Sequence, residues 1–206
     1  LQAGGGAALL SWLPSLRAQP QSAAERPGWP AWEAFKAQFI NEDGRVISDD
    51  AGGGQTYSEG QAYALFFSLV ANDRAAFDKL LRWTENNLCD GDMTARLPAW
   101  LWGKRPDGSW GVIDSNAASD ADLWIAYALG EAGRLWNVRS YRAFSALVAA
   151  RILREETAQL PGLGLTLLPA PQGFAQGDGR WRLNPSYMPM HLMHWLAAVD
   201  PQPEWK

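Results

Sequence analysis

Apolar residues recur at the spacing of an α-helix in six stretches of the chain. In the first stretch, Trp32, Phe35 and Phe39 mark one face of a helix over about 30–40. The other five predicted helices cover the apolar run 62–70 with its start near Glu59, the stretch around 77–88, the run that follows Ser119 to 136, the stretch 138–158 and the stretch 189–199.

Polar and glycine-rich segments separate these helices. Residues 41–57 form a polar loop, and the connection 89–118 carries three Trp residues. A connection of that length inside a compact domain is usually functional. We expect an extended piece over 162–169 and a turn over 173–182. Helices that alternate with long aromatic loops predict an all-α fold of antiparallel helix pairs, with the loops gathered at one end.

Two of the predicted helices begin with acidic residues. Ser119 is a natural N-cap, which places Asp120 and Asp122 in the first turn of its helix. The segment Thr56–Gln61 follows a glycine-rich turn and places Glu59 at the start of the next apolar helix in the same way. A first-turn acid often does no more than complement the helix dipole. Because the design occurs twice, it predicts a cleft with paired carboxylates.

The amino-acid composition argues against nucleic-acid binding and metal binding and is compatible with the binding of flat polar rings. A chain of 206 residues that is 47% hydrophobic can bury a substantial core. The net charge of −4 comes without a basic stripe, which argues against a nucleic-acid partner. The single Cys89 excludes an intramolecular disulfide, and His191 and His194 have no evident third ligand, so we expect no metal and no cofactor. Twelve Trp residues is a high number, and open clefts that bind flat polar rings use Trp in quantity.

The first 26 residues differ from the rest. Residues 3–16 are small and apolar and are too short to span a bilayer. With Ser22, Ala23 and Ala24 after them, they resemble the remnant of a secretory signal that lacks its basic start. The alternative is a disordered tail. The signal interpretation predicts a periplasmic or secreted protein without stable membrane insertion, and it leaves 27–206 as one domain.

Several motifs together carry a resemblance to a known family. The segment 118–136 reads Ala-Ser-Asp-Ala-Asp-x-x-Ile-Ala-x-Ala-Leu-Gly-x-Ala-x-x-x-Trp, and 57–63 reads Tyr-Ser-Glu-Gly-Gln-Ala-Tyr. Gly-Arg-Val at 44–46, Arg-Leu-Pro-Ala-Trp at 96–100 and Asn-Pro-Ser-Tyr at 184–187 accompany them. This combination resembles glycoside hydrolase family 8, and within it the periplasmic endoglucanases encoded with bacterial cellulose synthases.

The resemblance covers about 29–205 and implies a fold. Members of the family fold as an (α/α)6 barrel of twelve helices with a cleft across one end. Six predicted helices correspond to about the first half to two-thirds of such a barrel. We therefore expect 27–206 to be the N-terminal part of a single barrel domain, present as a monomer.

The resemblance also implies a reaction, the inverting hydrolysis of β-1,4-glucan by an endoglucanase. Such a reaction needs one carboxyl group to protonate the leaving oxygen and another to activate water. The family position of Glu59 is that of the general acid, and the position of Asp120 binds the sugar ring where the chain is cleaved. The helix start stabilises the Glu59 carboxylate, so the charge of Asp120 is needed to raise its pKa. We expect Asp122 to have a buried structural role.

The aromatic residues carry weaker expectations. Trp102 and Trp110 lie in the loop before Asp120, where they would either stack on glucose rings or pack within the protein. Tyr187 has the family position of a cleft residue. Tyr63 and Trp124 lie inside apolar helices and are expected in the core. Trp181 fits either role.

The catalytic base of the family is missing from this sequence. In the family it is an Asp in a later segment of the Gly-Ser-Tyr-Asp-Ala-x-Arg kind, and no such segment occurs here. We therefore expect a fragment that is poorly active alone. Two alternatives remain: a non-catalytic glucan-binding module, and a family enzyme acting on chitosan, xylan or mixed-linkage β-glucan. Contact with a cellulose synthase complex is a further open question.

Overall fold

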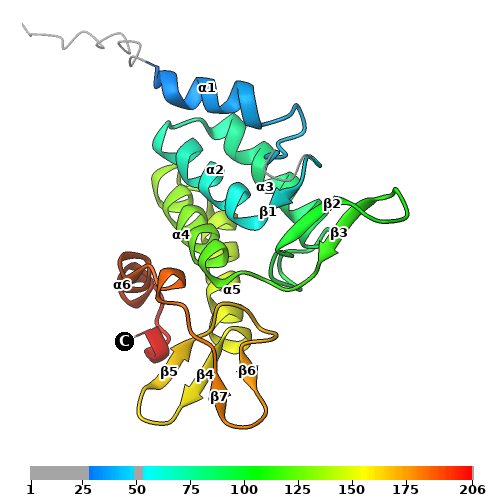
Figure 1. Cartoon of the computed structure of the whole chain (residues 1–206). Helices are drawn as coiled ribbons and strands as arrows, with labels where there is room; N and C mark the ends of the chain where they lie inside the picture. Colours follow the sequence, from blue (N-terminus) through cyan, green and yellow to red (C-terminus); the bar gives the residue numbers. More distant parts are fainter. Residues whose placement is uncertain (1–27, 49–52, 206) are drawn as a thin grey trace, which may run out of the picture.

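The computed structural model describes residues 28–48 and 53–205, so the predicted signal remnant or tail at 1–26 lies outside the described residues (Figure 1). All six predicted helices are present in this part of the chain. They are α1 (Pro30–Phe39), α2 (Ser58–Val70), α3 (Arg74–Leu88), α4 (Ser119–Leu135), α5 (Arg139–Glu155) and α6 (Met190–Val199). Short turns at 71–73 and 136–138 reverse the chain and make helical hairpins of α2 with α3 and of α4 with α5. The predicted all-α class is confirmed.

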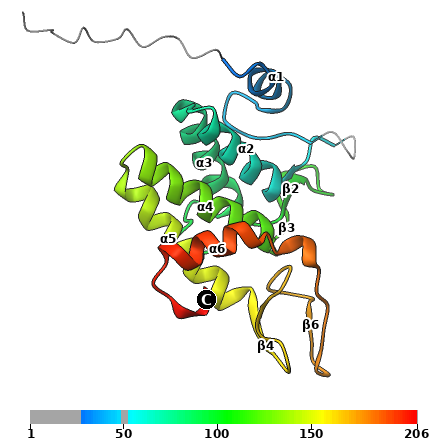
Figure 2. The same cartoon turned by 90° about the vertical axis from the view of Figure 1, so that its left-hand side faces the viewer.

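Helix α4 lies at the centre of the packing, in contact with α2, α5 and α6 (Figures 1 and 2). Alanine and glycine dominate its buried surface, which lets its neighbours approach closely. At Gly130 a Cβ atom would lie 2.2 Å from the Trp195 ring of α6 and 2.9 Å from the Ser145 hydroxyl of α5. A larger residue there would push both helices away, so the sequence of α4 sets the spacing of the bundle.

A buried amide fixes the start of α2. Gln61 is fully buried, and its Oε1 accepts a 2.6 Å hydrogen bond from the backbone N–H of Val46. Its Nε2 donates to the Thr84 hydroxyl of α3 at 2.9 Å and to the carbonyl of Gly44 at 3.2 Å. Gly44 has φ +93 and a Cβ there would lie 2.5 Å from the Lys79 backbone, so only glycine fits. The loop before α2 is thus tied to both helices.

Part of the predicted long loop 89–118 is a sheet. Strands β2 (Leu101–Lys104) and β3 (Trp110–Asp114) form an antiparallel hairpin, and β1 (Thr56–Tyr57) pairs with β2 on its other edge. The register sets Thr56 opposite Trp102 and Tyr57 opposite Leu101. This sheet therefore connects the tryptophan-rich segment directly to the start of α2.

Two further hairpins correct the expectations for the C-terminal third. The extended piece expected at 162–169 is one strand of the hairpin β4 (Thr157–Leu160) and β5 (Gly164–Leu167). Because β4 begins at Thr157, α5 ends earlier than predicted. The turn at 173–182 contains the short hairpin β6 (Ala175–Gln176) and β7 (Arg180–Trp181). Single helical turns η1 (Pro185–Tyr187) and η2 (Pro203–Trp205) flank α6.

The expected N-cap of α4 is wrong. Ala118 occupies the N-cap position. Ser119 is the first helical residue, and its buried hydroxyl has no hydrogen-bond partner among the described residues. The backbone N–H of Ser119 instead donates to the carbonyl of Pro169 at 3.0 Å. A contact with a distant segment therefore replaces the local cap. Of the helices in 28–48 and 53–205, none combines the length and hydropathy needed to cross a bilayer.

Candidate active site

Glu59 lies in the first turn of α2, held by the sheet beside it. The backbone N–H of Ser58 donates to the Trp100 carbonyl at 2.9 Å, which fixes the helix start against the segment that leads into β2. The indole Nε1 of Trp100 then donates to Glu59 Oε1 at 3.1 Å, and the Ser58 hydroxyl donates to Oε2 at 3.3 Å. The carboxyl group is half-buried with both oxygens engaged. Its orientation is therefore fixed before any ligand binds.

Asp120 lies in the first turn of α4 and is also half-buried. Its Oδ1 accepts a 2.9 Å hydrogen bond from the backbone N–H of Ala121. Within the described residues, neither Asp120 nor Glu59 forms an ion pair with a Lys, Arg or His side chain. In this part of the chain, the groups that contact the two carboxyl groups are backbone N–H groups of the helix starts and neutral side-chain donors.

The environment raises the pKa of Glu59. Burial is the main cause, and the negative charge of Asp120 adds to it. The N–H of the helix start, Trp100 and Ser58 all act in the opposite direction, because each donates to the carboxylate. The expected contribution of Asp120 is therefore present, but burial is larger. Burial also raises the pKa of Asp120, against the effect of its backbone hydrogen bonds.

Two tyrosines share the electrostatic environment of the acids. Burial raises the pKa of Tyr63 and of Tyr187, and in both cases the charges of Asp120 and Glu59 raise it further. Tyr187 thus lies near both acids, and its contact with sugar stays a prediction. The expectation of Tyr63 in the core is wrong: its side chain is 39% exposed, because it extends from α2 on the side of the acids. Trp124 is half-buried and packs edge-on against Tyr63, with ring centroids 5.9 Å apart.

Two aromatic hollows adjoin the acids. One of about 470 Å³ is lined by Glu59 itself, by Tyr57 and Tyr63, and by apolar residues of α1 and α2. The other, of about 210 Å³, is lined by Trp100 and Tyr187 together with the segment that ends at Ala118, two residues before Asp120. Apolar walls beside a pair of carboxyl groups suit a ligand with apolar faces and polar edges, such as a sugar ring.

Trp102 and Trp110 are not among the side chains around the acids. They stack on one another with ring centroids 5.4 Å apart, and the Arg45 guanidinium lies over both rings at 4.4 and 5.0 Å. Trp83 of α3 meets the Trp102 ring edge-on. Packing therefore accounts for Trp102, whereas Trp110 is 49% exposed. Contact of either ring with sugar stays a prediction. Trp181 in β7 is half-buried, so packing and sugar contact both remain open for it.

Trp100 is the site residue that sequence reasoning missed. It belongs to the same tryptophan-rich segment as Trp102, yet only Trp100 reaches Glu59. Its ring also packs against Tyr57, with centroids 5.6 Å apart. The only sequence signal was its place in the Arg-Leu-Pro-Ala-Trp motif, which does not state where the ring points.

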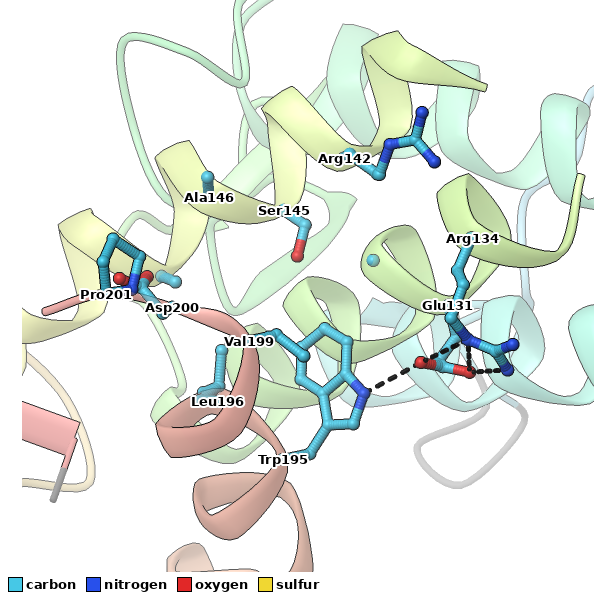
Figure 3. A pocket seen from close by; sticks show the side chains of 12 residues that line it. Glu131, Arg134, Arg142, Ser145, Ala146, Trp195, Leu196, Val199, Asp200 and Pro201 are labelled. Atoms are coloured by element: carbon cyan, nitrogen blue, oxygen red, sulfur yellow. Dashed lines mark hydrogen bonds and ion pairs between the residues drawn. The ribbon is translucent and has the colours of Figure 1, made fainter. Parts of the chain in front are cut away.

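A separate hollow of about 250 Å³ lies among α4, α5 and α6 (Figure 3). There Trp195 Nε1 donates to Glu131 at 2.8 Å, and Arg134 pairs with the same carboxylate at 2.6 Å. Neither Glu59 nor Asp120 lines this hollow. The residues that the structure describes contain no cluster of three or more His, Cys, Asp or Glu that could hold a metal ion.

Comparison with known proteins finds a family and close relatives. The family described as glycosyl hydrolases family 8 matches residues 10–206. An endoglucanase of Escherichia coli O157:H7 is 53% identical over 169 residues, which are 82% of this chain and 46% of that protein. An endoglucanase of Pseudomonas fluorescens is 47% identical over 182 residues, or 88% of this chain and 46% of that protein. The chain thus spans about half the length of the curated relatives it matches.

Solved structures give the same result. The crystal structure of an endo-1,4-D-glucanase from Vibrio fischeri matches this chain with a TM-score of 0.83 and 54% identity. The matched region covers 86% of this chain and 51% of the glucanase chain. The structure of a cold-adapted family 8 xylanase also matches, with a TM-score of 0.61 and only 18% identity. This match covers 78% of this chain and 40% of the xylanase chain, and it shows the shared fold alone. The helices described here are consistent with an incomplete (α/α)6 fold.

Proposed function

Because the chain belongs to glycosyl hydrolases family 8, we propose that the whole protein is an endo-β-1,4-glucanase that cleaves cellulose chains with inversion. One observation carries the proposal. Two carboxyl groups with raised pKa values, Glu59 and Asp120, lie at neighbouring helix starts beside aromatic hollows. Cleavage of a glycosidic bond needs a carboxyl group that keeps its proton near neutral pH, and burial provides that condition for Glu59.

In this proposal Glu59 donates the proton to the leaving oxygen. Trp100 and Ser58 hold its two oxygens at 3.1 and 3.3 Å and so aim the carboxyl group. Asp120 binds the sugar ring at the cleavage point, and its charge helps Glu59 to retain its proton. Tyr63 and Tyr187 border the same space and contact the sugar. No metal or organic cofactor takes part.

Inversion also needs a carboxylate that activates water on the opposite face of the sugar. We assign that base to an Asp outside 1–206, in the later segment that the family resemblance implies. The proposed activity is accordingly that of the whole protein. The proposal extends to a periplasmic or secreted location, a monomeric state and contact with a cellulose synthase complex. Fractionation of the cells that make the protein, followed by co-purification with the synthase, tests the location and the contact.

Two other functions use the same cleft. A non-catalytic module that guides glucan would keep the aromatic hollows and need no base. A family enzyme for chitosan, xylan or mixed-linkage β-glucan would keep the acids and differ in the residues along the cleft. The raised pKa of Glu59 favours catalysis over binding alone, since a binding module gains nothing from a protonated carboxyl group.

The decisive experiment is reducing-sugar release from carboxymethylcellulose by the full-length protein. We expect activity in the wild type and its loss in Glu59→Gln. Glu42→Gln is the matched control, because Glu42 is an exposed glutamate in the loop before α2. Undiminished activity in Glu59→Gln would overturn the acid assignment. An inactive wild type that still binds cellulose would favour the guiding module, and faster release from chitosan, xylan or mixed-linkage glucan would reassign the substrate.

A further inference from the structure

A second pair of carboxyl groups lies in the core beside the start of α4. Asp122 belongs to the first turn of α4, two residues after Asp120, and Glu156 is the residue that follows α5. Both side chains are fully buried. The reaction proposed above uses neither of them, and acids are rarely fully buried unless they are paired.

In the part of the chain that the structure describes, the two carboxyl groups have no polar partner except each other. No N–H or O–H group of another described residue donates to any of their four oxygens. The two carboxyl groups are neighbours in the core, since each acts directly on the pKa of the other. As two carboxylates they would place two unpaired charges in the core with no donor between them. One proton removes a charge and supplies the missing donor.

The surrounding charges also favour a proton on the pair. The charges of Asp120, Glu59 and Glu155 raise the pKa of Asp122, and all three residues are acids. Arg151 and Arg154 are engaged by Glu155, at 2.7 and 2.6 Å. Cys89, at the end of α3, is buried and its pKa is raised by burial and by the charge of Asp122, so it stays a neutral thiol.

Burial favours a proton on the pair, and the position of Asp122 in α4 indicates which residue holds it. Burial raises the pKa of both groups well above the ordinary range. The positive end of α4 favours negative charge on Asp122 in its first turn, so we place the proton on Glu156.

A backbone bridge spans the same two helix ends. The N–H of Leu168 donates to the Glu156 carbonyl at 2.7 Å, and the carbonyl of Pro169 accepts from the N–H of Ser119 at 3.0 Å. The chain at 168–169 thus joins the end of α5 to the start of α4. The carboxyl pair makes a side-chain link between the same places, immediately behind the turn that carries Asp120.

We propose that Glu156 and Asp122 share a proton, and that this buried link positions Asp120 opposite Glu59. Both are positioning residues, since neither touches the sugar. The positioning role rests on the proposed glucanase function, whereas the shared proton does not. The proton stays in place at neutral pH because its loss would leave two buried charges without a donor.

Infrared spectroscopy of the full-length protein tests the shared proton. A protonated carboxyl group has a C=O stretch that is distinct from the bands of a carboxylate. We expect the wild type to keep such a band at pH 7 and Glu156→Gln to lose it, since an amide N–H then donates to the Asp122 carboxylate. Glu155→Gln is the matched control and leaves the band unchanged. The wild-type spectrum minus the Glu156→Gln spectrum cancels the bands of other protonated acids, Glu59 included. A difference spectrum without this band overturns the proposal.

Kinetics test the positioning role. Glu156→Gln keeps a donor for Asp122 and should keep kcat, whereas Glu156→Leu removes the donor and should lower kcat per folded molecule about 100-fold. A purely structural role would lower the melting temperature and leave kcat of the folded fraction unchanged, which would overturn the positioning role. If Glu156→Leu does not fold, Glu156→Asp replaces it, because its shorter side chain cannot reach Asp122 in the same geometry. A wild type without glucanase activity would overturn the proposed function, and the spectrum would still decide the shared proton.

Discussion

The starts of α2 and α4 each present one acid to the cleft, but they hold it differently. Glu59 at the start of α2 has both oxygens engaged, by the indole of Trp100 and the hydroxyl of Ser58. Asp120 at the start of α4 accepts one hydrogen bond, from the backbone N–H of Ala121. The support of Asp120 lies behind it, in the contact of Ser119 with Pro169 and in the buried Asp122. This difference fits the proposed roles, in which Glu59 delivers a proton and is oriented directly, whereas Asp120 binds sugar and keeps an oxygen available.

The largest expected effect comes from substitution of the two acids, and a substrate with a better leaving group distinguishes their roles. Glu59→Gln should slow cellulose hydrolysis by the full-length protein about 10²–10⁴-fold, since it removes general acid catalysis. The same variant should retain much more activity on β-cellobiosyl fluoride, because fluoride leaves with little help from a proton. Asp120→Asn should slow both substrates, since sugar binding is needed for either. Rates of product release on the two substrates give the answer, and an equal loss for Glu59→Gln on both would contradict the proton-donor role.

A second prediction concerns what holds the start of α2. Gln61→Leu leaves the N–H of Val46 and the Thr84 hydroxyl without their partner, so we expect unfolding in urea to become easier by about 1–3 kcal/mol. Gln159→Leu, at an exposed position of β4, is the control and should change stability by less than about 0.5 kcal/mol. Equal stability of the two variants would show that the buried amide does not fix this helix start.

A third prediction uses the opposing influences on the pKa of Glu59. Activity requires protonated Glu59 and so falls as pH rises through its pKa. Asp120→Asn removes a charge that raises this pKa, so the alkaline limb of kcat/KM should move to lower pH. Trp100→Phe removes a donor that lowers the pKa, so the limb should move to higher pH. Shifts in the same direction, measured on β-1,4-glucan oligosaccharides, would contradict the assignment of Glu59 as the titrating group.

The sequence predicted the helices and the placement of Glu59 and Asp120 in first turns, because both depend on local patterns. Apolar spacing located all six helices, and first-turn acids located Glu59 and Asp120. Tyr63 was misplaced because α2 is apolar on nearly every side, and such a run does not show which face is exposed. The Ser119 cap failed because Pro169, 50 residues later, supplies the contact instead.

The tryptophan-rich segment shows a different limit. A sequence pattern indicates that Trp100, Trp102 and Trp110 lie near Asp120 along the chain, but the strand pairing decides where each ring points. Trp102 and Trp110 share the face of the sheet that packs under Arg45. Trp100 precedes β2 and is free to reach Glu59. Pairing between β1 and β2 joins residues about 45 positions apart, which no local pattern reveals.

The smallest expected effect tests whether the sheet beside α2 also contacts the ligand. Trp110 is 49% exposed, and a sugar ring stacked on it would gain roughly 0.5–1.5 kcal/mol, the range found for aromatic contacts. Trp110→Ala should therefore raise KM for long β-1,4-glucan chains a few-fold and leave kcat unchanged, with Ile113→Ala, an exposed apolar residue of the same strand, as control. If KM stays the same while stability falls, Trp110 only packs with Arg45. The ligand would then contact the start of α2 through Glu59 and Tyr63, and the sheet would serve to orient Glu59 through Trp100.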